Sequence, residues 1–146
     1  MATTVYHGTD LWGAARMLLH GIRPGLYVTD AARLAVRYAA AQATRTVDPD
    51  VTRLPARAVL VTIETPETVR WLRRDRRTAR SLDLCEAVID AGRILAVETP
   101  PDADLDAYLE AGRCRSHATP LLGATRMATT CLACAYAIVR AAVQPA

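Results

Sequence analysis

The sequence predicts an α+β fold, and three observations predict it. Two N-terminal segments share one pattern, in which a short run of strand-forming residues ends at an Asp and an alanine-rich amphipathic stretch follows. Further along, strand-like and helix-like segments mix without the strict alternation of a doubly wound sheet. The length of 146 residues suits one compact domain with a buried core. We therefore expect a single domain over residues 1–146, within which about 113–146 could be a C-terminal helical extension.

The first strand and helix are predicted from Thr3 onward. Residues 3–7 favour a strand, and Asp10 is a good helix N-cap because its carboxylate accepts a hydrogen bond from a free N–H of the first turn. The helix carries a clear apolar stripe, made of Leu11, Ala14, Ala15, Leu18 and Leu19. Gly21 is expected to end this helix, and Pro24 prevents a restart.

The second strand and helix repeat this pattern. Residues 26–29 favour a short strand, and Asp30 is the expected N-cap of the helix that follows. One face of that helix carries Leu34, Ala35, Tyr38, Ala39 and Gln42. Residues 44–55 are polar and include two prolines, which predicts a loop. Residues 58–63 are all but continuously apolar and predict a strand buried on both faces.

The next elements are shorter. Pro66 is expected to open a short helix through Trp71. Strands are predicted over residues 84–89 and 94–98, and the Asp-Ala-Gly-Arg sequence at 90–93 between them indicates a hairpin turn.

The C-terminal part is predicted to be helical. Asp102 or Asp104 is expected to cap a helix that runs to Glu110 and is ended by Gly112. Residues 121–142 predict a long alanine-rich helix.

Composition describes a folded chain without a membrane anchor. Hydrophobic residues make up 51% and charged residues 23% of the chain, as in soluble proteins. The net charge of +3 does not by itself indicate nucleic-acid binding. The N-terminus lacks a secretory signal, and the apolar stretch 127–139 is too short to span a bilayer. We expect a cytoplasmic protein with no membrane partner, although a toxin exported by a dedicated system would have the same features.

The first third of the chain contains an ordered set of short patterns. They are Tyr6-His7-Gly8-Thr9, Ala14 to Leu19, Gly21-Ile22-Arg23-Pro24, Leu26-Tyr27-Val28-Thr29-Asp30, Ala35 and Tyr38-Ala39. This set resembles the opening of ADP-ribosyltransferases of the H-Y-E class, the diphtheria-toxin and poly(ADP-ribose) polymerase side of that superfamily. The resemblance implies split antiparallel β-sheets around an NAD cleft with flanking helices. It also implies cleavage of the nicotinamide–ribose bond of NAD, through a transition state with oxocarbenium-like charge on the ribose.

The resemblance also implies roles for the N-terminal site residues. His7 would hydrogen-bond a hydroxyl of the adenine-side ribose. Gly8 would hold the nicotinamide carboxamide through its backbone N–H and C=O, and Thr9 could add a hydroxyl contact. Tyr27 would stack on the nicotinamide ring, since an aromatic face suits a flat partner, and Tyr38 could support that stack. A core histidine and a core tyrosine would explain His7 and Tyr27 equally simply when each is taken alone.

The third member of the H-Y-E set should be an acidic residue on a later strand, beside the nicotinamide ribose. Glu86 is the expected residue, because it lies in an otherwise apolar strand where a carboxylate is costly without a partner or a task. Asp83, at the entrance of that strand, is the alternative. Many protein-modifying members have Glu or Gln two residues before the catalytic Glu, and here that position is Leu84, which argues against arginine modification.

Just before this strand, residues 70–80 hold six arginines opposed only by Asp75. In the family this loop touches the acceptor, so an arginine-rich loop would suit a phosphate-bearing acceptor or the NAD pyrophosphate. A solvated helix face explains the same run.

Two of the four cysteines lie three residues apart near the C-terminus. Cys114, His117, Cys131 and Cys134 have a spacing compatible with a structural zinc site. Buried thiols on one helix face explain Cys131 and Cys134 as well, and no catalytic metal is expected.

We therefore expect an NAD-dependent ADP-ribosyltransferase that uses NAD as its substrate. The acceptor, whether a protein, a nucleic acid or a small molecule, is open, as is an inhibitory partner protein of the kind that toxin-like enzymes have. Two other enzymes on the same fold are alternatives: an NAD glycohydrolase, or an RNA 2′-phosphotransferase in which His7, Arg23 and the arginines of residues 70–80 would contact phosphate. Arg23 is also expected among the residues that contact NAD. A non-catalytic protein that binds NAD or ADP-ribose is the remaining alternative.

Overall fold

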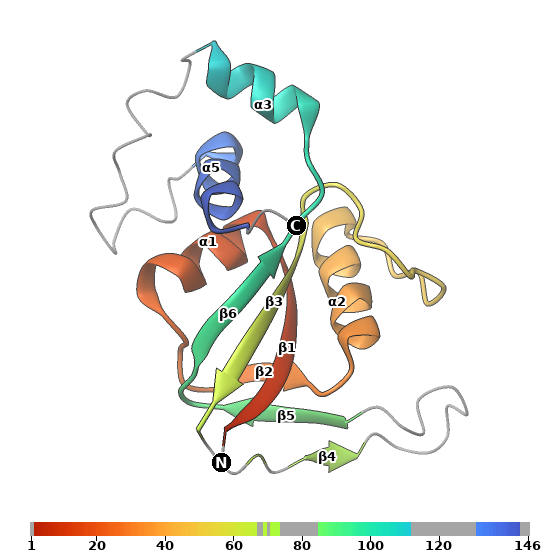
Figure 1. Ribbon diagram of the computed structural model, residues 1–146. Helices are drawn as coiled ribbons and strands as arrows, with labels where there is room; N and C mark the ends of the chain where they lie inside the picture. Colours follow the sequence, from red (N-terminus) through yellow and green to blue (C-terminus); the bar gives the residue numbers. More distant parts are fainter. Residues whose placement is uncertain (1, 67–68, 70, 74–84, 112–130, 144–146) are drawn as a thin grey trace.

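The computed structural model describes residues 2–66, 69, 71–73, 85–111 and 131–143. In chain order its elements are β1 (Thr3–Asp10), α1 (Leu11–His20), β2 (Leu26–Thr29), α2 (Ala32–Thr44), β3 (Ala58–Thr65), β4 (Leu72–Arg73), β5 (Cys85–Ile89), β6 (Arg93–Glu98), α3 (Ala103–Glu110) and α5 (Leu132–Ala142). The six strands form one antiparallel sheet in the order β4-β5-β2-β1-β3-β6, and the predicted α+β class is confirmed (Figure 1). None of the helices in the described part is long and apolar enough to cross a membrane.

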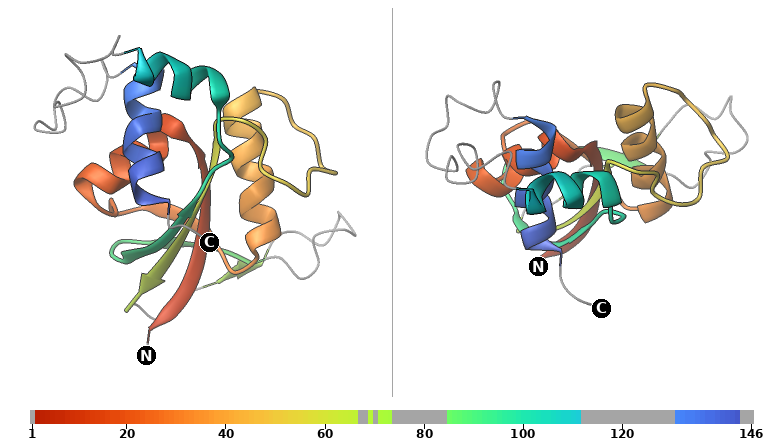
Figure 2. Two further views of the ribbon diagram at one scale, coloured as in Figure 1. Left: turned by 45° about the horizontal axis from the view of Figure 1, so that its top comes forward. Right: turned by 90° about the horizontal axis from the view of Figure 1, so that it is seen from above.

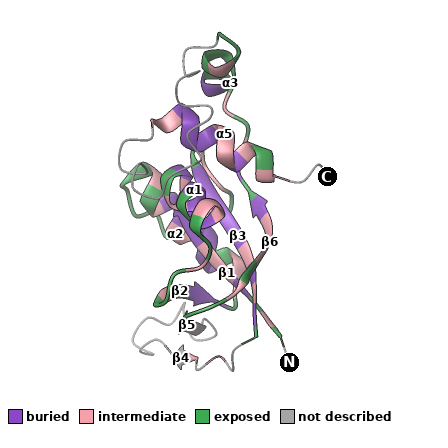
Figure 3. Ribbon diagram, turned by 90° about the vertical axis from the view of Figure 1, so that its left-hand side faces the viewer, coloured by how far each residue is buried: buried purple, intermediate pink, exposed green. Residues whose placement is uncertain are grey.

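Helices cover both faces of the central strands. α2 packs on one face, against β1 and β3, while α1 and α5 pack against each other on the other face (Figure 2). The largest fully buried side chains include Val5, Leu11, Ile63, Ile89, Tyr136 and Val139. Buried residues run along most of β3 and of α5 (Figure 3). Tyr136 and Val139 belong to the same core cluster as the strands and α1, so α5 contributes directly to the core.

The sheet consists of two halves joined by a narrow seam. β1 pairs with β3 at eight positions and β2 pairs with β5 at four, but β1 and β2 pair only at Tyr6 and Thr29. In Figure 1 the strands β2, β5 and β4 run across the direction of β1, β3 and β6. The sheet is therefore continuous, yet it opens on one side of the Tyr6–Thr29 pair.

The start and end of α1 follow the sequence prediction. The Asp10 carboxylate accepts a hydrogen bond from the N–H of Gly13 at 2.9 Å. At the other end, Gly21 has φ 78° and its N–H donates to the Met17 carbonyl at 2.8 Å. A positive φ of this kind is accessible to glycine without the steric cost that other residues meet.

Replacement of Asp10 by Ala is expected to lower the free energy of unfolding by about 1 kcal/mol, because the first turn of α1 loses its side-chain acceptor. Asp10→Asn keeps an oxygen acceptor and is expected to retain most of the stability. Urea unfolding of the two variants measures the difference. Equal destabilisation by Asn and Ala would show that the carboxylate charge matters rather than the cap.

The predicted N-cap of α2 is wrong. The N-cap residue is Ala31, not Asp30, and it makes no side-chain cap hydrogen bond. The Thr29 hydroxyl accepts a hydrogen bond from the Ala31 N–H at 3.2 Å. A local hydroxyl-to-backbone turn therefore competes with the capping geometry that Asp30 would need.

The predicted hairpin at residues 90–93 is also wrong. β5 pairs with β2 and β4, whereas β6 pairs with β3, so the two strands lie in different halves of the sheet. The connection between them is fixed by non-local hydrogen bonds. Asp90 accepts from the Gly25 N–H at 2.9 Å, and the Thr65 hydroxyl donates to the Ala91 carbonyl at 2.8 Å.

Two helix predictions need correction. Pro66, Val69 and Trp71, the described residues of the predicted short helix, are not helical, and a strand follows them. The long helix expected over 121–142 does not run unbroken, because Cys131 has extended backbone and is the N-cap of α5. Residues 121–130 lie outside the described part.

The cap of α3 is confirmed at Asp102, whose carboxylate accepts from the Leu105 N–H at 3.0 Å. Asp102 also lies 3.5 Å from the Arg57 guanidinium. Tyr136 of α5 donates from its hydroxyl to the Asp106 carboxylate at 2.8 Å, so polar contacts tie α3 to α5. The predicted helix end at Gly112 lies outside the described residues.

Candidate functional site

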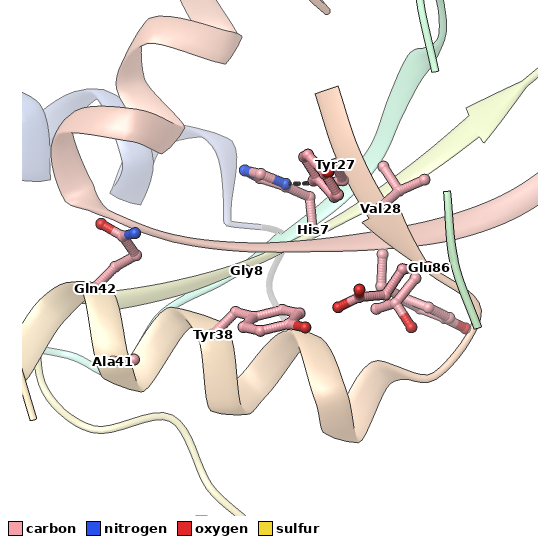
Figure 4. Close-up of a pocket in the computed structure, with 10 residues that line it drawn as sticks. His7, Gly8, Tyr27, Val28, Tyr38, Ala41, Gln42 and Glu86 are labelled. Carbon is pink, nitrogen blue, oxygen red and sulfur yellow. Dashed lines mark hydrogen bonds between the residues drawn. The ribbon is translucent and has the colours of Figure 1, made fainter. Parts of the chain in front are cut away.

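A cavity of about 460 Å³ opens beside the seam of the sheet, between β1, β2, β5 and α2 (Figure 4). Its lining residues are Tyr6, His7, Gly8, Tyr27, Val28, Thr29, Tyr38, Ala41, Gln42 and Glu86. This volume lies in the range of pockets that hold small molecules and cofactors. It is larger than three other hollows of the described part, which measure about 90, 190 and 350 Å³.

Aromatic rings and one carboxylate dominate the chemistry of the cavity. Three of the five tyrosines in a chain without phenylalanine, Tyr6, Tyr27 and Tyr38, line it. Among the described lining residues, Glu86 is the single carboxylate, and no Arg is present. Aromatic faces and a carboxylate both attract cations, so the cavity suits a flat ligand with positive charge.

The strand register brings Glu86 to the cavity. Glu86 of β5 is opposite Thr29 of β2, and Thr29 is in turn opposite Tyr6 of β1. Residues opposite one another in an antiparallel sheet point to the same face, and Tyr27 shares that face because it lies two residues before Thr29. One row of residues across three strands, Tyr6, Thr29 and Glu86, therefore includes the carboxylate. The next position on this face of β2 is the exposed Tyr27.

The break in the β1–β2 ladder creates the opening. If the ladder continued past Tyr6 and Thr29, Gly8 would be opposite Tyr27, but this pair is not formed. Instead, Nδ1 of His7 lies 2.6 Å from the backbone carbonyl oxygen of Tyr27 (Figure 4). The imidazole thus joins the two strands where their backbones have separated.

This hydrogen bond determines which ring nitrogen of His7 is protonated. A carbonyl oxygen can only accept, so Nδ1 must carry the hydrogen. Burial lowers the pKa of His7 below its ordinary value, and the hydrogen bond to Tyr27 opposes that shift only in part. At neutral pH the ring is therefore uncharged, and Nε2 is a hydrogen-bond acceptor.

The lowered pKa of His7 has a consequence for stability. Between pH 6.5 and the lower folded-state pKa, the unfolded chain binds more protons than the folded chain. The contribution of His7 to the free energy of unfolding is therefore fully present above pH 6.5. It is lost as the pH falls through the folded-state pKa. Urea unfolding at several pH values is expected to show this loss for the wild type. His7→Asn keeps a donor near the Nδ1 position but does not titrate, and its stability should fall less steeply over that window.

The Glu86 carboxylate is partly removed from water. It is half-buried, and burial raises its pKa above the ordinary value. In Figure 4 its carboxylate points into the space that Tyr38 of α2 borders from the other side. A partly desolvated carboxylate in a cavity is typical of functional sites.

A second hollow, of about 190 Å³, adjoins the first at His7. Its lining includes His7, Thr9, Gly13, Arg16, Met17, Gly21, Arg23 and Leu26. Arg16 and Arg23 give it positive charge, and no carboxylate is among its described lining residues. Thr9 is buried and borders this hollow rather than the larger cavity.

The structure thus brings together residues that are far apart in sequence. His7, Gly8, Tyr27, Tyr38 and Glu86 line one cavity, whereas Thr9 and Arg23 lie at the adjoining hollow. Asp83, Leu84 and most of the 70–80 arginine run lie outside the described residues.

Four residues of the two hollows have no site role in the sequence prediction: Tyr6, Thr29, Gln42 and Arg16. Gln42 is one helical turn after Tyr38, so the shared helix face was a usable signal. The positions of Tyr6 and Thr29 depend on strand register, which no local pattern in this sequence indicates.

The structure describes two of the four predicted zinc ligands. Cys131 and Cys134 are close together, but Cys114 and His117 lie outside the described residues. Within the described part of the chain, no three His, Cys, Asp or Glu residues form a group suited to a metal ion.

Comparison with known proteins gives no relative from which a function could be transferred. No protein-family model, no curated protein and no solved structure matches this chain. The function of this chain is therefore inferred from the geometry and chemistry of its site.

Proposed function

We propose that the chain binds NAD in the cavity beside the seam, cleaves its nicotinamide–ribose bond and transfers ADP-ribose to an acceptor. One observation supports this most. His7, Tyr27 and Glu86 come from three different strands, and they line the same cavity. These are the residues that the resemblance to H-Y-E ADP-ribosyltransferases assigns to NAD.

The chemistry of the cavity suits the nicotinamide end of NAD. The nicotinamide ring of NAD is flat and cationic, and the cavity offers three tyrosine rings and one carboxylate. Tyr27 is 62% exposed, so much of its ring is available for stacking. Gly8 and Tyr27 line the same cavity, and the Gly8 backbone would hold the carboxamide of the nicotinamide.

The reaction then needs little acid catalysis. The C–N bond breaks, its electron pair leaves with nicotinamide, and the ribose takes on oxocarbenium-like charge. The Glu86 carboxylate would hydrogen-bond a ribose hydroxyl and stabilise that charge, while Nε2 of His7 would accept from a hydroxyl of the other ribose. The acceptor forms the new bond to ribose and loses its proton to water.

The second hollow suits the pyrophosphate of NAD. The pyrophosphate lies between the two riboses of NAD, and it carries negative charge that Arg16 and Arg23 would attract. His7 borders both hollows, so a ligand that spans them would pass the imidazole.

Incubation of the purified protein with NAD, with nicotinamide measured by chromatography, tests the proposal. Release of nicotinamide is expected, and labelled NAD added to a cell lysate would identify the acceptor as protein, nucleic acid or small molecule. Release with water as the sole acceptor would favour an NAD glycohydrolase. Binding of NAD with no release under any acceptor would favour a non-catalytic binder. No binding of NAD would overturn the proposal.

Loss of the Tyr27 ring is expected to weaken the binding of the nicotinamide ring of NAD. Tyr27→Ala should raise the KM for NAD by about tenfold, the cost of one aromatic stacking partner. Tyr27→Phe keeps the ring and should stay close to the wild type. Trp12→Ala removes another exposed aromatic side chain that does not line the cavity, so it serves as the control. Equal KM values for Tyr27→Ala and the wild type would argue against stacking.

A further inference from the structure

Two cysteine thiols face each other at the start of α5. The Sγ atoms of Cys131 and Cys134 are 3.3 Å apart, and the two residues are not joined by a disulfide. Cys131 is the N-cap residue, and its Sγ accepts a hydrogen bond from the Cys134 N–H at 3.4 Å. The backbone therefore already holds both sulfurs in one place, and a small rotation of the side chains would bring them to the bonding distance of about 2.05 Å.

The two thiols differ in how far a reagent can reach them. Cys134 is 3% exposed and belongs to the core cluster. Cys131 is partly exposed and lines a hollow of about 350 Å³ between α3 and α5. Among the described residues, the others that line this hollow are Asp104, Leu105, Tyr108, Leu132 and Ala133. Cys131 can thus contact a ligand in the hollow, whereas Cys134 is buried with its Sγ beside that of Cys131.

We propose that Cys131 and Cys134 form a redox-active dithiol that reacts with a low-molecular-weight disulfide. The size of the hollow, about 350 Å³, suits a small molecule. Its described lining is mainly apolar apart from Asp104, so a small organic disulfide can pack against it. The position of Cys131 at a helix N-terminus adds backbone N–H groups that favour the thiolate, which is the attacking species.

The exchange balances without a metal or a further cofactor. The Cys131 thiolate attacks one sulfur of the disulfide RSSR, forms a mixed disulfide with it, and releases RS⁻. The Cys134 thiolate then attacks Sγ of Cys131, forms the Cys131–Cys134 bond and releases the second RS⁻. The two protons lost by the protein thiols are taken up by the two leaving thiolates, so two RSH are formed. The disulfide RSSR is the oxidant.

This dithiol is independent of the proposed NAD chemistry. Its hollow shares no lining residue with the cavity at the seam. The competing interpretation is the zinc site predicted from Cys114, His117, Cys131 and Cys134, in which the same two thiols would be metal ligands.

The test titrates the full-length protein with mixtures of reduced and oxidised glutathione. Acid quenching, alkylation and peptide mass spectrometry then report the state of each cysteine, and metal analysis of the untagged protein reports zinc. We expect the wild type to form a Cys131–Cys134 disulfide that excess reduced glutathione reverses. Cys85→Ser, the control, should behave in the same way.

Two variants assign the roles of the thiols. Cys134→Ala removes the resolving thiol and fits an apolar site, so a glutathione mixed disulfide should accumulate at Cys131. Cys131→Ser keeps a good N-cap and should leave Cys134 unmodified. A disulfide to another cysteine, or no oxidation at any glutathione ratio, would overturn the proposal. Stoichiometric zinc that must be removed before the wild-type thiols react would overturn it in favour of the metal site.

Discussion

Replacement of Glu86 by Gln is expected to reduce nicotinamide release by about 10²- to 10³-fold, the usual cost of removing one group that stabilises charge in a transition state. The amide keeps the shape and hydrogen-bonding capacity of the side chain but removes its negative charge. NAD should still bind, with a Kd within about threefold of the wild type, because the lost interaction develops mainly in the transition state. Measurements of kcat and of NAD binding by calorimetry separate the two effects.

Glu98→Gln is the matched control, because Glu98 is also a strand glutamate but is exposed on β6, away from the cavity. Its kcat should equal that of the wild type. Unchanged release in Glu86→Gln, together with loss of release in Asp83→Asn, would transfer the role of the third site residue to Asp83. A Glu86→Gln variant that no longer binds NAD would indicate a ground-state contact instead.

The same substitution is expected to stabilise the fold at neutral pH. Burial raises the folded-state pKa of Glu86, so its stabilising contribution is present below the unfolded pKa and is lost as the pH rises through the folded-state pKa. At pH 7 the ionised side chain therefore opposes folding, and Gln does not. Thermal unfolding should show a higher Tm for Glu86→Gln at pH 7 and a smaller difference near pH 4. A lower Tm at pH 7 would mean that the carboxylate supports the fold.

Replacement of Gly8 by Ala is expected to lower the free energy of unfolding by at least about 3 kcal/mol, the upper part of the range for inserting an atom into a packed interior. A Cβ built on Gly8 would overlap the carbonyl oxygen of Ala35 and lie 2.7 Å from the backbone nitrogen of Ala39. Both atoms belong to the backbone of α2, so no side-chain rotation can relieve the contact. For a chain of this size the change corresponds to a fall in Tm of roughly 6–12 °C.

Gly13→Ala provides the matched control for Gly8→Ala. A Cβ at Gly13 would meet the hydroxyl of Thr9, which is part of a side chain and can rotate, and Ala favours the helix over Gly. We expect this variant to remain within about 1 kcal/mol of the wild type. Equal destabilisation by both substitutions would show that α2 does not depend on its close approach to β1.

Gly8 also illustrates how one residue serves both fold and site. Without a side chain at this position, α2 packs directly on β1. That contact brings Tyr38 and Gln42 to the edge of the cavity. Packing is therefore a sufficient physical reason for glycine here, beside the backbone contact to nicotinamide that the resemblance implies.

Several elements of the fold were predictable because their causes are local. Asp10 and Gly21 bound α1, and the strand over residues 26–29 was predicted at its observed ends. Caps, glycine conformation and short apolar runs act within a few residues, so the printed sequence contains the whole cause. Where two local effects compete, as at Asp30 and Thr29, the pattern alone does not determine the outcome.

The sequence by itself determined the α+β class, the positions of most helices and strands, and His7, Tyr27 and Glu86 as candidates. The tertiary structure alone decided that β5 joins β2 rather than β6, that the β1–β2 ladder opens after a single pair, and that Cys131 and Cys134 meet beside a hollow. Strand partners are chosen by burial and backbone pairing between segments distant in the chain, whereas capping and periodicity depend only on neighbours. The cavity exists because of that non-local pairing.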